Sequence, residues 1–240
     1  MSFEASHYIF LLVYLPLLAI GIGVLLFLKK KRLGWVELRF AIIALLLFAG
    51  RLLLIAFGLG QFPNLAYDPI FYGIILIAGL GVMMFYVREI ENMHIRQLGK
   101  WKEQPIRQII VSIIVTVLML LSSVLILFIA INYRVNTHPE ITVDKFFTAL
   151  FFGLGAIYEE WFFRGVMLQY RQWGALKQIT ISSLTFFAIH IGYLPFIAYG
   201  SYYLIMLIFS FALGTAAKFQ GILSSTIIHF LYVFISVLAI

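Results

Sequence analysis

The sequence predicts an all-α polytopic membrane protein, built as a bundle of about eight transmembrane helices. Two observations predict this class. Of the 240 residues, 63% are hydrophobic and only 11% are charged, whereas a soluble domain is roughly 45–50% apolar and about 25% charged. In addition, apolar runs of helical length recur along the whole chain, and clusters of basic residues separate alternate runs. No polar stretch is long enough to form a soluble domain.

Each predicted span is an apolar run long enough to cross a bilayer. A helix needs about 20 mainly apolar residues to cross a hydrocarbon core of ~30 Å. The boundary between the sixth and seventh runs is open, because Gly192, Pro195 and Gly200 could instead mark a broken helix. The runs are 8–28, 39–59, 70–87, 108–131, 146–169, 179–199, 201–217 and 220–240. We expect residues 1–145 to form an N-terminal four-helix region and residues 146–240 a four-helix core, joined as one structural unit.

The basic residues predict the orientation of these spans. They concentrate after the first, third, fifth and seventh runs, so the positive-inside rule places those loops in the cytoplasm and both termini outside. We expect an integral protein of a bacterial cell membrane. The formal net charge of +7 fits contact with anionic lipid headgroups and gives no reason to expect nucleic acid. The chain has no cysteine, which excludes disulfides, thiol catalysis and Cys-based metal sites.

Several ionisable residues lie inside the predicted spans. Glu159, Glu160 and Arg164 fall within YEEWFFRG in the span 146–169, and His190 and His229 lie in two later spans. A charged side chain at the bilayer centre costs at least ~2.5–3.5 kcal/mol, so such residues usually face the bundle interior and often mark function. These five side chains are therefore the candidate functional residues.

The helical spacing turns Glu159 and Glu160 in different directions from the helix axis. Glu160 and Arg164 are four residues apart with the acid first, which is the favourable order for an ion pair on one helix face. Glu159 is rotated by about 100° from Glu160 and lacks this partner. A structural ion pair accounts for Glu160 and Arg164, and it leaves Glu159 unexplained.

Glu159, His190 and His229 are predicted to lie at one depth. At 1.5 Å per residue they stand roughly 15, 16 and 14 Å from the cytoplasmic ends of their helices. A carboxylate and two imidazoles at one level could form a site inside a bundle. The carboxylate could serve as general base and acid, with histidines aiding a water or an oxyanion. The same trio could instead ligate zinc, with water in the fourth position, or relay protons.

Three motifs in this region resemble a known family. Glu159 to Arg164 matches EExxxR, Phe186 to His190 matches FxxxH, and His229 near the end of the last span matches a third motif. Their order and their placement on separate spans resemble the CPBP family, the group of CAAX prenyl proteases and bacteriocin-processing proteins also called Abi proteins. The resemblance covers about residues 146–235.

The resemblance implies an intramembrane endopeptidase with a buried catalytic cavity. By this similarity, Glu159 activates the hydrolytic water together with His190, and His229 stabilises the oxyanion. The implied substrate is a peptide or a lipid-anchored protein, including a prenylated one, at the surface of membrane lipid.

The resemblance also gives the neighbouring residues a role. Glu160, Arg164 and Phe186 would support the site. We expect a glutamate-dependent enzyme without a cofactor. Zinc is the alternative, and its ligands would be Glu159, His190 and His229.

One position departs from the family pattern. The third motif usually reads HxxxN or HxxxD, and here Val233 stands at its last position, where it cannot donate a hydrogen bond. This departure favours an alternative function, a catalytically weak or inactive scaffold or bacteriocin-immunity protein that binds a peptide or a membrane partner. A small proton-coupled transporter is less favoured, since the chain shows no internal repeat of the kind many transporters have.

Overall fold

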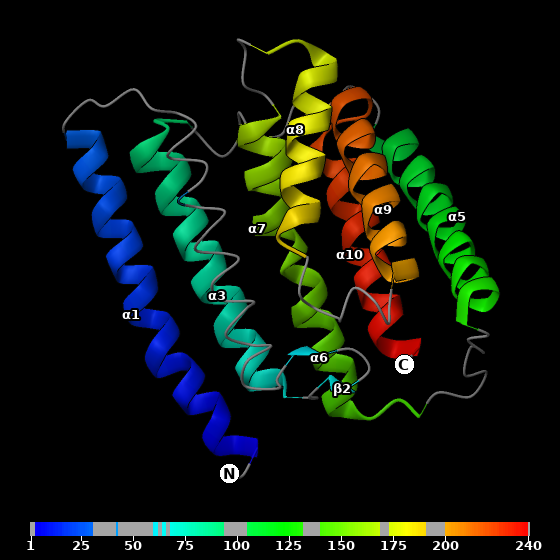
Figure 1. Ribbon diagram of the computed structural model, residues 1–240, viewed down its shortest axis with the longest axis horizontal. Coiled ribbons are helices and arrows are strands. Elements are labelled where there is room, and N and C mark those ends of the chain that lie inside the picture. The colour runs from blue at the N-terminus through cyan, green and yellow to red at the C-terminus, as the bar shows by residue number, and fades with distance from the viewer. Residues whose placement is uncertain are drawn as a thin grey trace.

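The described part of the protein is almost entirely helical (Figure 1). The computed structural model describes residues 3–30, 42, 60–61, 64–65, 68–93, 105–131, 140–168, 173–190 and 200–239. One short antiparallel pair of strands accompanies the helices, with Gly60 opposite Leu65 and Gln61 opposite Asn64. The elements in chain order are α1 (Phe3–Lys30), β1 (Gly60–Gln61), β2 (Asn64–Leu65), α3 (Pro69–Phe85), η1 (Tyr86–Ile90), α5 (Pro105–Ile131), α6 (Val143–Leu154), α7 (Ala156–Glu160), η2 (Trp161–Met167), α8 (Ala175–Ala188), α9 (Gly200–Phe219) and α10 (Ile222–Ala239).

Five helices in the described residues are long and apolar enough to cross a membrane. This finding confirms a polytopic helical membrane protein, but it does not establish the predicted count of eight. The five fall on the predicted runs 70–87, 108–131, 146–169, 201–217 and 220–240. The helices are Pro69–Ile90, Pro105–Ile129, Val143–Met167, Gly200–Phe219 and Ile222–Ala239.

The other three predicted spans have different outcomes. The run 8–28 lies within α1, where the segment Leu15–Lys29 is apolar but shorter than a full span. The run 39–59 lies outside the described residues, apart from residue 42. The run 179–199 differs from the observed helix, because α8 begins at Ala175 and ends at Ala188. Residues 191–199 lie outside the described part of the chain.

Local sequence signals start and stop several of these helices. Asp68 accepts a hydrogen bond from the amide of Phe71 at 3.0 Å, and Pro69 occupies the first turn of α3, both typical of a helix N-terminus. Thr142 caps α6 in the same way through the amide of Lys145. At the α9–α10 corner, Gly221 has a φ of 114°, a conformation that glycine adopts without a steric penalty. The chain therefore reverses there in a very short turn.

The helices form a bundle in which α10 is shared by several neighbours. It packs against α5, α6 and α9, and it also contacts α7 and η2. α8 packs against α9 and η2, while α3 contacts α6 and α7 and has α1 at its outer side (Figure 1). The segment that carries both glutamates therefore lies inside the bundle.

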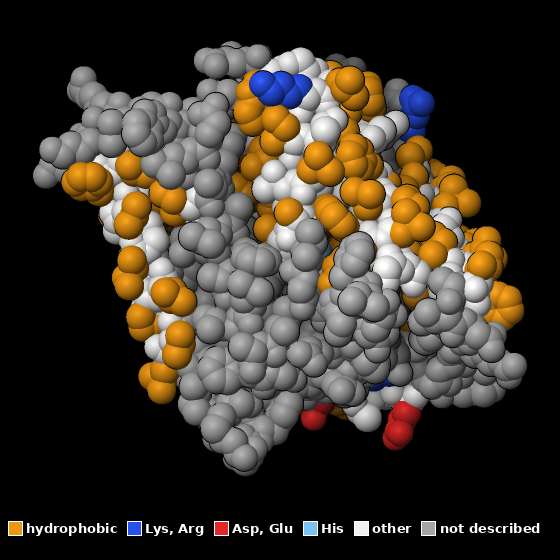
Figure 2. Space-filling view, in the orientation of Figure 1, with side chains coloured by type: hydrophobic (Ala, Val, Ile, Leu, Met, Phe, Trp, Pro, Cys, Tyr) orange, Lys and Arg blue, Asp and Glu red, His pale blue; other side chains and the backbone are white. Residues whose placement is uncertain are grey.

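The outer surface fits a lipid environment. Figure 2 shows hydrophobic side chains over much of the described surface, along the helices rather than in one patch. On α5 they include Ile110, Leu121 and Ile129, which are exposed, whereas Ser112 and Thr116 are buried. A transmembrane helix in a bundle is expected to turn its apolar side chains outward and its small polar side chains inward.

The span that contains YEEWFFRG changes its winding at the glutamates. α7 ends at Glu160, and the next seven residues, Trp161–Met167, form the π-helical segment η2. The amide of Leu168 accordingly bonds the carbonyl of Phe163, five residues back, at 3.1 Å. Short π-helical segments inside α-helices are frequent at functional sites.

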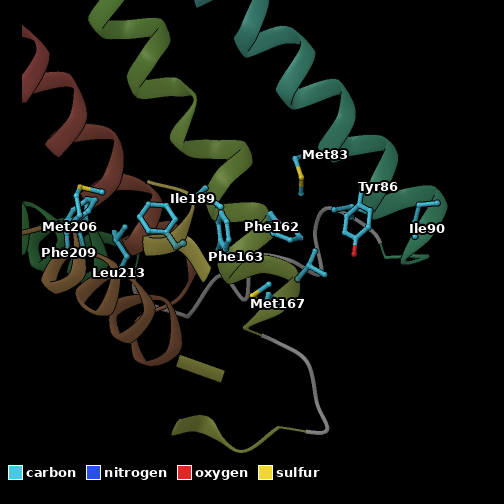
Figure 3. Packing of buried hydrophobic residues seen from close by; sticks show 14 of the residues in the cluster. Met83, Tyr86, Ile90, Phe162, Phe163, Met167, Ile189, Met206, Phe209 and Leu213 are labelled. Atoms are coloured by element: carbon cyan, nitrogen blue, oxygen red, sulfur yellow. The ribbon is translucent and has the colours of Figure 1, made fainter. Parts of the chain in front are cut away.

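The buried core gathers around η2. Figure 3 shows Phe162 and Phe163 between Met83 and Tyr86 on one side and Phe209 and Leu213 on the other. Phe162 contacts the Tyr86 ring, with ring centroids 6.1 Å apart, whereas Phe163 meets Phe186 of α8 edge-on at 5.3 Å. Adjacent aromatic residues thus attach this segment to two different helices.

Candidate active site

The six residues singled out by the sequence all lie buried. Glu160 and Phe186 have no exposed surface, and Arg164 is 1% exposed. Glu159, His229 and His190 are 6%, 4% and 7% exposed. Charged residues are almost never fully buried unless they are paired, so their partners are decisive.

Glu160 and Arg164 form the predicted ion pair. Nη1 of Arg164 donates to Oε1 of Glu160 at 3.0 Å. Nη2 of Arg164 donates to the carbonyl oxygen of Ser210 in α9 at 3.2 Å. The guanidinium carbon also lies 4.1 Å from the centre of the Phe186 ring, within the range of a cation–π interaction. The cation is therefore held by a carboxylate, a carbonyl and an aromatic face.

His229 bonds the same carboxylate oxygen. Its Nδ1 lies 3.0 Å from Oε1 of Glu160. An ionised carboxylate can only accept, so Nδ1 of His229 carries a proton. The sequence grouped His229 with Glu159 and gave no sign of this bond to Glu160. Glu160 thus joins Arg164 to His229.

His190 is oriented by the end of its own helix. The amide of His190 bonds the carbonyl of Phe187, three residues back, which leaves the Phe186 carbonyl without the usual i+4 amide. Nδ1 of His190 forms a hydrogen bond with that carbonyl oxygen at 2.7 Å. A carbonyl only accepts, so His190 also has its proton on Nδ1. His190 therefore lies in the turn after α8, whereas the run 179–199 placed it within the predicted span.

Phe186 lies at the centre of these groups. Its ring centroid is 4.4 Å from that of His190 and 5.3 Å from that of His229. Together with the Arg164 contact, one aromatic ring touches three of the site residues. The ends of α7 and α8 and the middle of α10 therefore converge at one place.

Glu159 lies beside this cluster. It is the penultimate residue of α7 and is buried, directly before the Glu160 that bonds His229. Tyr158, on its other side, packs so closely on α3 that a Cβ on Gly79 would lie 2.7 Å from the Tyr158 ring. The backbone that carries Glu159 is thus tightly packed.

Three buried residues near the cluster, Ser183, Ser210 and Gly214, were not among those predicted from the sequence. Ser183 of α8 donates from Oγ to the carbonyl of Ser210 at 3.0 Å, and Gly214 lies directly against Ser183. The signal that could have found two of them is the small-xxx-small spacing of Ser210 and Gly214, which is typical of close helix packing in membranes.

The acidic and imidazole groups of the described residues are not arranged as a metal site. Among the described residues, no group of three or more His, Cys, Asp or Glu side chains is placed to hold a metal ion. The ligand set that the sequence offered for zinc, Glu159, His190 and His229, does not meet this requirement.

A comparison with protein families matches this part of the chain. Residues 139–235 match the family model of type II CAAX prenyl endopeptidase Rce1-like proteins. The match contains all six site residues and confirms the resemblance predicted from the three motifs. The C-terminal region of this integral membrane protein is thus similar to the CAAX prenyl endopeptidases. No curated protein and no solved structure matches the chain.

Proposed function

We propose that the protein is an intramembrane endopeptidase that hydrolyses a peptide bond in a membrane-anchored substrate. The substrate is a small peptide or a lipid-anchored protein, including a prenylated one. The observation that carries the proposal is the convergence of His190, His229 and Arg164 on the Phe186 ring, in a buried site within the region that matches the endopeptidase family.

Glu159 and His190 are proposed to activate the water. Glu159 accepts a proton as the water oxygen bonds the scissile carbonyl carbon, and the C–N bond then breaks as the amine takes that proton. His190 orients the water through Nε2, because its Nδ1 is committed to the Phe186 carbonyl. The step consumes one water and needs no other reactant.

His229 is proposed to stabilise the oxyanion. In its doubly protonated form the ring donates from Nε2 to the developing negative charge. Glu160, 3.0 Å from Nδ1, balances the charge of that ring. Arg164 in turn holds Glu160 in place, so the ion pair supports the site rather than touching the substrate.

The orientation of the chain is part of the proposal. Lys177 lies near the start of α8 and Lys218 near the end of α9, and these two ends adjoin the same side of the bundle (Figure 1). Lys218 donates to Gln178 of α8 at 2.5 Å. The positive-inside rule supports a cytoplasmic location for this side, with both termini outside a bacterial cell membrane.

The test is cleavage of a fluorogenic farnesylated CAAX peptide by protein purified in nanodiscs. Glu159→Gln and His190→Ala should each lower kcat by at least about a hundredfold, the usual scale for general acid–base catalysis. Glu89→Gln, at a half-exposed glutamate of η1, is the control and should keep full activity. Cleavage that survives both site substitutions would refute the proposed mechanism.

A second candidate function rests on Val233, which replaces the usual hydrogen-bonding residue of the third motif. A scaffold or immunity protein would bind the peptide without cutting it. The same nanodiscs distinguish the two, because a scaffold gives saturable peptide binding with no cleavage. Its binding would also persist in a Glu159→Gln, His229→Gln double variant.

A further inference from the structure

Ser183 and Gly214 meet where α8 packs against α9. The Ser183 hydroxyl donates across the interface to the carbonyl oxygen of Ser210 at 3.0 Å. A Cβ built on Gly214 would lie 2.6 Å from that hydroxyl oxygen, closer than real Cβ atoms come. Glycine at 214 therefore leaves the room in which the Ser183 hydroxyl reaches the neighbouring helix.

The Ser210 carbonyl accepts a second side chain. Nη2 of Arg164 donates to it at 3.2 Å. Ser183, Ser210 and Arg164 are 0%, 0% and 1% exposed, so water does not compete for these bonds. One main-chain oxygen of α9 thus receives donors from α8 and from η2.

From this carbonyl a continuous line of bonds leads to His229. Arg164, which donates to the Ser210 carbonyl through Nη2, also donates through Nη1 to Oε1 of Glu160 at 3.0 Å. The same carboxylate oxygen accepts from Nδ1 of His229 at 3.0 Å. The line joins α8, α9, η2, the end of α7 and α10. Every link in it is a hydrogen bond between buried groups.

The geometry points to Ser183 as a positioning residue for His229. Its hydroxyl fixes the Ser210 carbonyl between α8 and α9, and this carbonyl fixes one side of the Arg164 guanidinium. Because the guanidinium is a rigid planar fork, its other side is then aimed at Glu160, which keeps His229 protonated on Nδ1. The inference deepens the proposed function and rests on it for the catalytic role of His229.

Ser182 provides the matched control. It is the preceding residue of α8 and is equally buried at 0%. Its hydroxyl, however, donates to the carbonyl of Ile179 in its own helix at 3.3 Å. Ser182→Ala and Ser183→Ala therefore remove the same atom from neighbouring buried positions, and only the second removes a bond between helices.

The first experiment compares the two variants in the farnesylated-peptide assay. Ser183→Ala should lower kcat roughly fivefold, the scale of one hydrogen bond, with KM unchanged. Ser182→Ala should leave both constants at the wild-type value, and melting temperatures recorded in the nanodiscs show whether both variants are folded. Equal kcat values for the two variants would overturn the inference.

A substitution at Gly214 separates positioning from packing. Gly214→Ala displaces the hydroxyl and should lower kcat at least as much as Ser183→Ala. In the Ser183→Ala, Gly214→Ala double variant the close contact is gone, and the next neighbour, Cγ2 of Ile179, lies at an ordinary 3.4 Å. The inference expects the double variant to stay roughly fivefold slow. Recovery of the wild-type kcat would show that only packing matters.

The last measurement does not depend on protease activity. In ¹⁵N-histidine-labelled protein the five histidines give ring-nitrogen signals, and His229→Gln identifies the signals of His229. Wild-type and Ser182→Ala protein should show His229 protonated on Nδ1, and Ser183→Ala a mixture of tautomers. If no peptide is cleaved but the spectra change in this way, the proposed function fails and the positioning role stands. An unchanged His229 spectrum in Ser183→Ala would refute the positioning role.

Discussion

Buried polar side chains occur on two regions next to α10, and they are satisfied in different ways. On α5, the hydroxyls of Ser112 and Thr116 donate to carbonyls four residues back in the same helix, at 2.6 and 2.8 Å. In the region of the candidate active site, Arg164, Ser183 and His229 form bonds that join different elements. Bonds of the first kind satisfy a hydroxyl wherever the helix lies, whereas bonds of the second kind fix the relative positions of helices.

This difference shows where the fold depends on polar groups. α5 can shift along α10 without losing the bonds of Ser112 and Thr116. The helices around the candidate site cannot shift in this way. A movement of α9 would displace the Ser210 carbonyl, which accepts a hydrogen bond from the buried Arg164 guanidinium. We therefore expect substitutions in the active-site region to be costly and those on α5 to be mild.

The largest effect is expected at the buried ion pair. Arg164→Leu leaves Glu160 buried without its cation and should lower the free energy of unfolding by about 3–5 kcal/mol. The measurement is thermal or denaturant unfolding in detergent micelles.

A double variant is the control for this prediction. Arg164→Leu combined with Glu160→Gln removes both charges, so most of the lost stability should return. A single variant as stable as the wild type would show that the pair does not hold the region together.

An intermediate effect is expected where α3 meets the active site. Gly79→Ala places a Cβ 2.7 Å from the Tyr158 ring, next to Glu159. Overpacking of this kind costs about 1–3 kcal/mol, and the displaced backbone should also lower the rate of peptide cleavage. Gly81→Ala, on the same helix with nothing within 4 Å, should have no effect on either measurement. Equal results for the two variants would contradict tight packing beside Glu159.

The smallest effect is expected where α10 meets α5. Tyr232→Phe removes the bond between the Tyr232 and Ser123 hydroxyls, which are 2.8 Å apart and join α10 to α5. Such a bond between membrane helices contributes about 0.6 kcal/mol on average. Ser112→Ala removes only a bond within α5 and should leave the melting temperature unchanged. A larger loss for Ser112→Ala than for Tyr232→Phe would reverse the comparison.

The spacing of Glu160 and Arg164 was enough to predict their bond. Both residues lie on one helix, where side chains four residues apart face the same side, and the structure confirms the pair at 3.0 Å. The roles of Glu159, His190 and His229 in catalysis stay predictions. The bond between His229 and Glu160 spans 69 positions and could not be read from spacing, because it depends on how α10 is rotated relative to α7.

The helix ends were predicted less well than the helices. The run 179–199 predicted a span, with a broken helix at Gly192, Pro195 and Gly200 as the open alternative, whereas α8 ends at Ala188 and His190 lies in the turn that follows. Hydropathy does not show this end, since the residues on both sides of it are apolar. The end is visible only in the hydrogen bonds, where the His190 ring replaces a main-chain donor at the Phe186 carbonyl.

The sequence by itself determined that this is a helical membrane protein, that the candidate site residues lie between residues 146 and 235, and which family that region resembles. These properties depend on composition and local spacing. Only the tertiary structure decided that His229 bonds Glu160, that Phe186 contacts three site residues, and that Ser183 and Ser210 take part. The physical reason is that these contacts depend on the rotation and crossing of helices, and one of the acceptors, the Ser210 carbonyl, belongs to the main chain and has no signature in the sequence.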